Sequence, residues 1–375
     1  MMKTAKIIIL IVVMFPLIAL GDIWVHGDSV GVNMKGYGEL EVWGPVIPGD
    51  STKQIDRITL LVGQNLNSVF DYYEDADNDI SQMLIAEPTL SDMEGFASIN
   101  NYYSDLPPDI HAAISPYAWT DEEYLIIKVI VTNIGAEAFD SRIGLDIISQ
   151  IAGDYDGVHT WLPESNIIDM SREGENHLGL KFLSHPMTSL SQFVWFSGYS
   201  AAGQDGALWS WMTARNIDTV AVCTNPDDGV VSIPSSAAIH MEPDVGIPFF
   251  YCIARGQTEA AMVENIAAAE SAYTTIFTVG IDDFPAMPET STLSQNYPNP
   301  FNPSTEINFK LVTAGEISLD VFNIGGEQVL NLQKGWMESG NHSVSFTNAN
   351  LPSGLYIYRL TAGSTQLQKK MTLLK

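Results

Sequence analysis

The sequence predicts a mainly β protein in two parts. The first is a large β-sandwich-like region with one amphipathic helix, over residues 22–281, and the second is a smaller β-sandwich over residues 295–375. Short runs rich in β-branched and aromatic residues recur along the chain, separated by turn-forming residues. The regular alternation of strands and helices that marks a doubly wound α/β fold is missing.

The first 21 residues have the layout of a secretory signal peptide. Lys3 and Lys6 form a positive start, residues 7–15 are continuously apolar, and small residues follow at 19–21. The apolar run is shorter than the ~20 residues that a membrane span requires. We therefore expect export, cleavage before Asp22 and no transmembrane span in the mature protein.

Strands account for most of the first region. Residues 124–132 form a nearly continuous apolar run, typical of a strand buried on both faces. A turn at 133–135 and a second apolar run at 139–149 predict a β-hairpin. Further strands are expected at residues 58–62, 178–183, 193–199, 220–223 and 247–254.

One helix is expected, over residues 259–277. Thr258 can cap its first turn, and its apolar residues recur at helical spacing. A single apolar stripe indicates that the helix lies along an edge or a face of the sandwich. The stripe consists of Met262, Ile266, Ala269, Tyr273 and Ile276.

Charge separates the two parts of the chain. Residues 22–290 contain nine Lys or Arg and 40 Asp or Glu, whereas residues 291–375 contain six and five. A segment rich in Pro, Ser and Thr at 282–294 is the expected linker. The formal net charge of -28 argues against nucleic acid as a partner.

The second part carries three motifs in order. The first, NYPNPFNPST at 296–305, holds three prolines that favour an extended backbone. The second, at 317–329, places Gly325 and Gly326 between two apolar strands, where positive φ permits a tight hairpin. The third, at 351–360, is an alternating strand with two tyrosines on one face.

Together with the basic end at 369–375, these motifs resemble the type A C-terminal sorting domain of the type IX secretion system, a small Ig-like β-sandwich. The resemblance implies export through the periplasm and recognition of the folded tail by an outer-membrane translocon. It also implies cleavage by a sortase-like peptidase, after which the rest of the protein is released or attached to the surface. A purely structural Ig-like module is the alternative. The matching residues are Pro298, Pro300, Pro303, Gly354, Tyr356 and Lys370.

We call residues 22–281 the cargo region, because the tail would direct its export. Its sequence contains no nucleophile-elbow, dinucleotide-binding or zinc-protease motif, and its six histidines form no i, i+4 pair. With 40 acidic residues available in residues 22–290, no catalytic carboxylate pair can be nominated. The absence of these motifs favours a region without catalysis of its own, although glycosidases leave little local signature in a sequence.

An acidic segment is the sharpest local feature of the cargo region. Asp75, Asp77 and Asp79 alternate, and a curled loop would direct their hard oxygens at one calcium ion. The alternative is a solvated acidic loop. Gly153-Asp154-Tyr155-Asp156-Gly157 is a weaker calcium candidate that also fits an ordinary turn.

Aromatic residues are the second feature, since seven of the eight tryptophans lie in the cargo region. Trp209 and Trp211 would share one face of a strand, where exposed indoles could stack on sugar rings. Ordinary core filling is the alternative.

Cys223 and Cys252 both lie in expected strands of an exported protein. One cross-strand disulfide and two buried free thiols are both compatible with the sequence.

These observations favour a secreted or surface-attached protein whose cargo region is a non-catalytic module that binds extracellular glycan or matrix. The alternative is a secreted hydrolase that acts on polysaccharide or peptide, with carboxylates gathered from distant loops. A passive matrix component without a ligand is the third possibility.

Overall fold

The computed structural model describes residues 22–45, 51–102, 104, 106–195, 205–278, 291–293, 296–311, 314–347, 351–363 and 365–374. The chain divides into two compact units, Met1–Val279 and Gly280–Lys375. The predicted mainly β fold is confirmed. The expected signal peptide at 1–21, and the expected linker apart from residues 291–293, lie outside the described residues.

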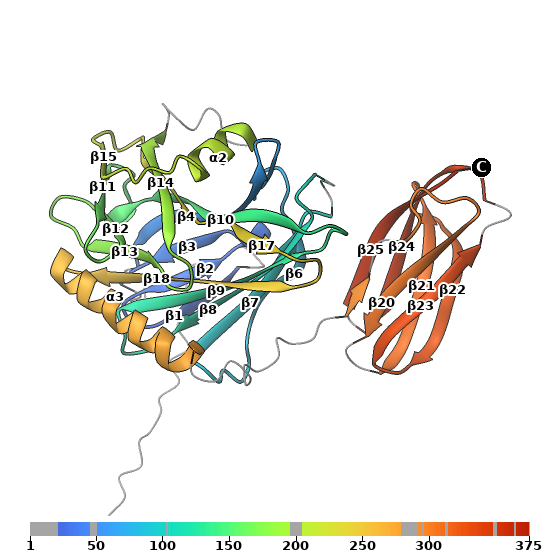
Figure 1. The fold of residues 1–375 in the computed structure, drawn as a ribbon. Helices are drawn as coiled ribbons and strands as arrows, with labels where there is room; N and C mark the ends of the chain where they lie inside the picture. The colour runs from blue at the N-terminus through green and yellow to red at the C-terminus, as the bar shows by residue number, and fades with distance from the viewer. Residues whose placement is uncertain are drawn as a thin grey trace, which may run out of the picture. The chain divides into compact units, whose positions relative to one another are not determined.

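The described part of the cargo unit consists chiefly of two nine-stranded antiparallel sheets (Figure 1). The first has the order β1 (Ile23–His26), β2 (Gly31–Met34), β3 (Leu40–Trp43), β4 (Lys53–Asn65), β10 (Phe139–Ser149), β16 (Val230–Ser236) and β14 (Met187–Val194), with β5 (Ser68–Phe70) beside β4 and β17 (Ile239–Met241) beside β10. The second has the order β15 (Val220–Cys223), β11 (Gly157–Leu162), β12 (Ile167–Ser171), β13 (His177–Phe182), β18 (Gly246–Gly256), β9 (Tyr124–Asn133), β8 (Ile110–Ala118), β7 (Met93–Asn100) and β6 (Asp77–Leu84).

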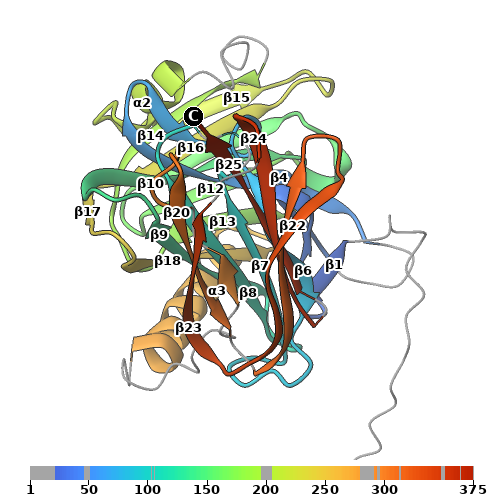
Figure 2. The ribbon, with the colours of Figure 1, turned by 90° about the vertical axis from the view of Figure 1, so that its right-hand side faces the viewer.

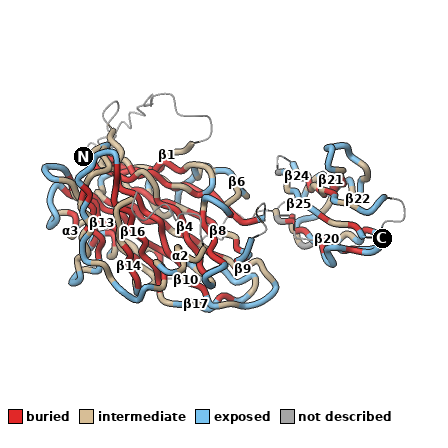
Figure 3. Tube along the Cα trace, turned by 90° about the horizontal axis from the view of Figure 1, so that it is seen from above, coloured by how far each residue is buried: buried red, intermediate tan, exposed pale blue. Residues whose placement is uncertain are grey.

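The two sheets enclose one large core, which Figure 3 shows as buried residues along the strands. Strand alternation decides which residues enter it. In β10, Ile143, Leu145 and Ile147 belong to the core between the sheets, while Asp146 and Ile148 lie on the opposite face. The first sheet therefore has an outer face that the main core does not use.

The predicted hairpin of residues 124–149 is wrong. Strand β9 pairs with β8 and β18 in the second sheet, whereas β10 pairs with β4, β16 and β17 in the first. The connection crosses the sandwich, and Asn133 supports it by donating hydrogen bonds to the backbone oxygens of Glu137 and Met241. A turn between two apolar strands occurs in both arrangements, so the pattern could not distinguish them.

The other strand predictions agree with the structure except at residues 193–199. There the strand β14 begins earlier and ends at Val194, while residues 196–200 lie outside the described part. Two short 3-10 turns, η1 (Gly36–Gly38) and η2 (Ile151–Gly153), complete the connections.

The predicted helix is confirmed as α3 (Glu259–Tyr273), continued by a π-helical turn at Thr274–Thr278. Thr258 caps it, because its hydroxyl accepts a hydrogen bond from the Ala261 N–H at 3.2 Å. The helix packs on the second sheet, where a Cβ added at Gly256 would lie 2.2 Å from the Met262 nitrogen.

A second helix, α2 (Asp205–Met212), packs on the outer face of the first sheet, so the two helices lie on opposite sides of the sandwich (Figures 1 and 2). Among the described residues, neither helix has the length and apolarity needed to cross a bilayer.

The tail unit is the predicted small β-sandwich. One sheet has the order β19 (Thr292–Leu293), β20 (Ser304–Leu311) and β23 (Gly340–Thr347), and the other β22 (Gln328–Met337), β21 (Gly315–Asn323), β24 (Gly354–Ala362) and β25 (Thr365–Leu373). The expected hairpin at Gly325 and Gly326 joins β21 to β22, and Gly326 has a φ of 79°.

Candidate binding face and sorting tail

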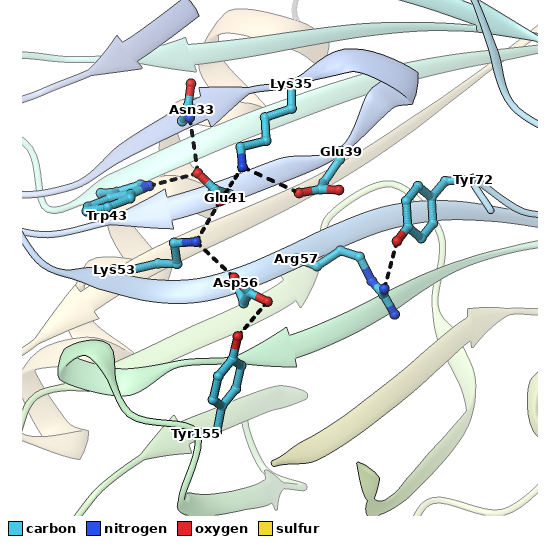
Figure 4. A network of polar contacts seen from close by, with 10 residues as sticks. All are labelled: Asn33, Lys35, Glu39, Glu41, Trp43, Lys53, Asp56, Arg57, Tyr72 and Tyr155. Atoms are coloured by element: carbon cyan, nitrogen blue, oxygen red, sulfur yellow. Dashed lines mark hydrogen bonds and ion pairs between the residues drawn. The ribbon is translucent and has the colours of Figure 1, made fainter. Parts of the chain in front are cut away.

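The outer face of the first sheet carries a continuous set of polar and aromatic side chains near strands β1 to β4 (Figure 4). In β3, Leu40 and Val42 enter the core, so Glu41 and Trp43 point outward. We call these outward side chains of β1–β4, together with Lys35, Glu39, Tyr72, Asp146, Tyr155 and Trp195, the aromatic–polar face.

Glu41 lies at the centre of one half of this face. Its Oε1 accepts hydrogen bonds from Lys35 Nζ at 2.7 Å and Lys53 Nζ at 2.6 Å, and its Oε2 accepts one from Asn33 Nδ2 at 3.0 Å. Burial alone would raise the pKa of Glu41, but these three hydrogen bonds lower it below its usual value. The carboxylate therefore stays ionised and fixes two ammonium groups.

Arg57 organises the other half. Its guanidinium binds Asp146 Oδ2 at 2.7 Å and the Tyr72 hydroxyl at 2.9 Å, and lies 4.9 Å from the centre of the Tyr72 ring. Burial raises the pKa of Asp146 to about 6, although the Arg57 charge acts in the opposite direction. The planar guanidinium thus locks both an acid and an aromatic ring in place.

Lys53 and Asp56 connect the Glu41 half to flanking aromatic rings. Lys53 Nζ lies 2.8 Å from Asp56 Oδ1, and the Tyr155 hydroxyl donates to Asp56 Oδ2 at 3.0 Å. Trp43 packs against Trp24 at a centroid distance of 5.3 Å, and Tyr155 against Trp195 at 5.5 Å. The Glu41 half of the network therefore has two aromatic pairs beside it.

Solvent reaches part of this network, since the side chains of Lys35, Asp56 and Lys53 are 34%, 26% and 20% exposed. Three of the nine Lys and Arg residues of the cargo region lie here, opposite four carboxylates. Fixed donors and acceptors beside aromatic rings, with nearly balanced charge, are suited to a polar ligand that also has apolar surface.

Trp209 and Trp211 do not lie in a strand, so the expectation that they share a strand face is wrong. They belong to α2, where residues two apart point about 200° apart. Trp209 lies over Gly63 of β4, and Trp211 packs on Phe193 with a centroid distance of 4.6 Å. Both are half-buried against the apolar cluster under α2, and their contact with a ligand stays a prediction.

The three aspartates of the calcium prediction lie in different settings. Asp75 is buried in the turn after β5, whereas Asp77 and Asp79 belong to β6. Asp79 Oδ2 contacts His111 Nε2 at 3.2 Å and accepts a hydrogen bond from Ser98 Oγ at 3.0 Å. In the described part of the chain, no three His, Cys, Asp or Glu side chains are arranged to hold a metal ion.

The weaker calcium candidate is an ion-paired turn. Arg172 lies 2.8 Å from Asp154 Oδ2 and 3.0 Å from Asp156 Oδ1, so both carboxylates already face a cation.

The two cysteines are buried free thiols. Cys223 lies in β15 and Cys252 in β18, and three strands separate β15 from β18 in the sheet. Four strand spacings correspond to roughly 19 Å, far beyond the reach of a disulfide. The structure therefore supports the free-thiol alternative.

In the tail, residues 296–303, which we call the proline strap, pair with the end of β25. The Phe301 N–H donates a hydrogen bond to the backbone oxygen of Thr372 at 2.9 Å, and the Leu374 N–H donates one to the backbone oxygen of Phe301 at 2.9 Å. The Thr372 N–H also donates to Asn299 Oδ1 at 2.8 Å. The Phe301 ring is only 1% exposed, so it anchors the strap in the tail core.

The sorting-motif residues have two kinds of position. Pro298, Pro300, Pro303 and Lys370 are exposed. Tyr356 is buried and donates its hydroxyl hydrogen bond to the Pro352 oxygen at 2.8 Å, and Gly354 begins the same strand. The motif therefore combines an accessible surface with residues that fold the domain.

Sequence reasoning missed the aromatic–polar face. The signal was present in the alternation of Leu40, Glu41, Val42 and Trp43 and in the scarcity of cations in the cargo region. The pairing of Arg57 with Asp146, 89 residues apart, has no local signal.

Comparisons with known proteins identify the tail. Residues 295–373 match the family model of the secretion system C-terminal sorting domain. No curated protein sequence matches the chain.

Several solved structures show low similarity to the chain. A bacterial glucoamylase complexed with acarbose is 12% identical, with a TM-score of 0.49. The match covers 69% of this chain and 36% of the glucoamylase chain. A GalM/aldose epimerase homologue from C. elegans is 7% identical, with a TM-score of 0.35. The match covers 64% of this chain and 100% of the epimerase homologue. A heparan sulfate lyase from Pedobacter heparinus is 9% identical with a TM-score of 0.29, covering 84% and 42%. The chain thus spans about a third of the glucoamylase's length.

The matched tail is therefore a type IX secretion C-terminal sorting domain, and the protein is exported, either for secretion or to the outer cell surface.

Proposed function

We propose that the cargo region is a non-catalytic binding module whose aromatic–polar face holds an extracellular glycan. The observation that carries this proposal is the polar network of Figure 4, flanked by the Trp24–Trp43 pair and the Tyr155–Trp195 pair. A sugar ring has hydroxyl groups around its rim and C–H groups on its faces, so it needs both kinds of partner.

The ion pairs favour binding because they hold the polar groups before a ligand arrives. Lys53 contacts both Glu41 and Asp56, and Arg57 contacts both Asp146 and Tyr72. Side chains that are already ordered lose little conformational entropy on binding. The near balance of charge on this face suits a neutral glycan better than a strongly anionic one.

Trp43→Ala is expected to weaken retention on the bound polysaccharide by about tenfold, because it removes an aromatic surface worth about 1.5 kcal/mol beside Lys53. Retention of the full chain on a panel of immobilised polysaccharides measures this. Trp336→Ala is the matched control, since Trp336 is 63% exposed in the tail. Unchanged retention by the Trp43 variant, with an unchanged melting temperature, would contradict the proposal.

Hydrolysis is the second candidate function, favoured by the raised pKa of Asp146, which suits a general acid near neutral pH. Measuring released reducing ends in the same assay separates the two functions. We expect retention without release, because the Asp146 side chain is only 6% exposed and is held by Arg57. Release that Asp146→Asn abolishes would make the protein an enzyme, and neither signal would favour a passive matrix role.

A further inference from the structure

The turn that follows β5 buries two carboxylates. Asp71 and Asp75 are each 4% exposed. They lie in one helical turn, in which the N–H groups of Asp75 and Ala76 both donate hydrogen bonds to the backbone oxygen of Asp71. Carboxylates are almost never buried to this extent without a positive partner. Something must therefore compensate the charge of this pair.

Backbone hydrogen bonds satisfy one oxygen of each carboxylate. Asp71 Oδ1 accepts from the N–H groups of Tyr73 and Glu74 at 2.6 and 2.9 Å, and Asp75 Oδ2 accepts from the Asp71 N–H at 3.1 Å. The remaining oxygens, Asp71 Oδ2 and Asp75 Oδ1, are buried and have no hydrogen-bond partner in the described part of the chain. Two unsatisfied acceptors in one turn point to a cation.

The surrounding charges increase this need. Burial is the largest reason why the pKa of Asp75 rises to about 7, and the charges of Asp71 and of Asp205, the first residue of α2, raise it further. The Asp71 N–H and the Ser104 hydroxyl act in the opposite direction, but neither carries a positive charge. Asp71 also has a raised pKa, again chiefly through burial. Arg57 is the cation that acts on Asp71, and its guanidinium already binds Asp146 and Tyr72.

We propose that Asp71 and Asp75 bind one calcium ion through Asp71 Oδ2 and Asp75 Oδ1. Calcium prefers hard carboxylate oxygens and completes its shell with backbone oxygens and water. With two carboxylates from the chain, the affinity falls in the range of extracellular calcium modules, about 10⁻⁴–10⁻³ M. An exported protein meets calcium outside the cell, and the site keeps Asp75 from the sequence prediction but replaces Asp77 and Asp79 with Asp71.

The test compares the melting temperature of the full chain at pH 8 in millimolar calcium and in EDTA. Calcium is expected to raise the melting temperature of the native chain, and this shift is expected to vanish in Asp71→Asn and Asp75→Asn. Asparagine keeps the hydrogen-bond acceptor and removes the charge, so both variants should fold. Asp77→Asn and Asp79→Asn are the matched controls and should keep the full shift.

Two outcomes would overturn the proposal. If the Asp77 and Asp79 variants lost the calcium-dependent rise in melting temperature equally, calcium would be assigned to Asp75, Asp77 and Asp79 instead. No calcium shift in the native chain would mean that a proton compensates the pair. Terbium emission sensitised by Tyr72 and Tyr73, and its displacement by calcium, gives a second readout on the native chain that does not depend on the variants folding.

Discussion

Deletion of residues 291–375 is expected to abolish delivery to the cell exterior and leave the cargo region in the periplasm. The deleted segment contains the whole matched sorting domain, including the exposed prolines and Lys370. The cargo core is formed by residues of the cargo region's own two sheets and their connections. The cargo region should therefore still fold, and cell fractionation with surface protease digestion measures where it accumulates.

Trp336→Ala in the full chain is the control for this deletion, because it changes an exposed tail residue outside the three motifs. It should reach the exterior as the native chain does. Normal surface delivery of the deletion variant would show that export does not depend on the tail. Loss of the protein from every fraction would indicate degradation and would require the melting temperature of the truncated protein before any conclusion.

Phe301→Ala is expected to destabilise the tail by about 3–5 kcal/mol, the usual cost of removing a buried phenylalanine. The ring is 1% exposed and packs against Phe346 with a centroid distance of 5.6 Å. Domains of this size are stable by only about 5–15 kcal/mol. The variant should therefore lose a large part of the tail's stability, measured as urea-dependent proteolysis of the tail in the full chain.

Tyr297→Ala is the matched variant, since Tyr297 belongs to the same strap but is 82% exposed. Its effect should stay within about 0.5 kcal/mol, as for ordinary surface substitutions. Similar protease resistance of the two variants would mean that the Phe301 ring does not anchor the strap. We expect export of the Phe301 variant to fall with its stability, because residues 295–373 match the sorting domain that directs export.

Local pattern predicted the tail better than the cargo region. The tail's turns and strands depend on short-range features, such as the glycine pair at 325–326 and the alternation around Tyr356 and Tyr358. In the cargo region, the choice between a hairpin and a crossing at residues 133–139 depends on which distant strands are available. Trp209 and Trp211 show the same limit, because packing of α2 on the first sheet determined their conformation.

The candidate binding face was beyond local reasoning for a related reason. Lys53 meets Glu41 across 12 residues and Arg57 meets Asp146 across 89, so strand order had to be known first. Sequence reasoning singled out Asp75, whose carboxylate accepts a hydrogen bond from the Asp71 N–H four residues earlier, whereas Asp77 and Asp79 belong to β6. A helical turn, rather than an extended acidic strand, brings the carboxylates together.

The proline strap also has a consequence for the timing of folding. Phe301 is made more than 70 residues before its hydrogen-bond partners Thr372 and Leu374. The sandwich cannot close until both have emerged on the same side of the inner membrane. A nascent or partly translocated chain that does not yet extend through Leu374 therefore lacks a complete tail and cannot present the closed domain.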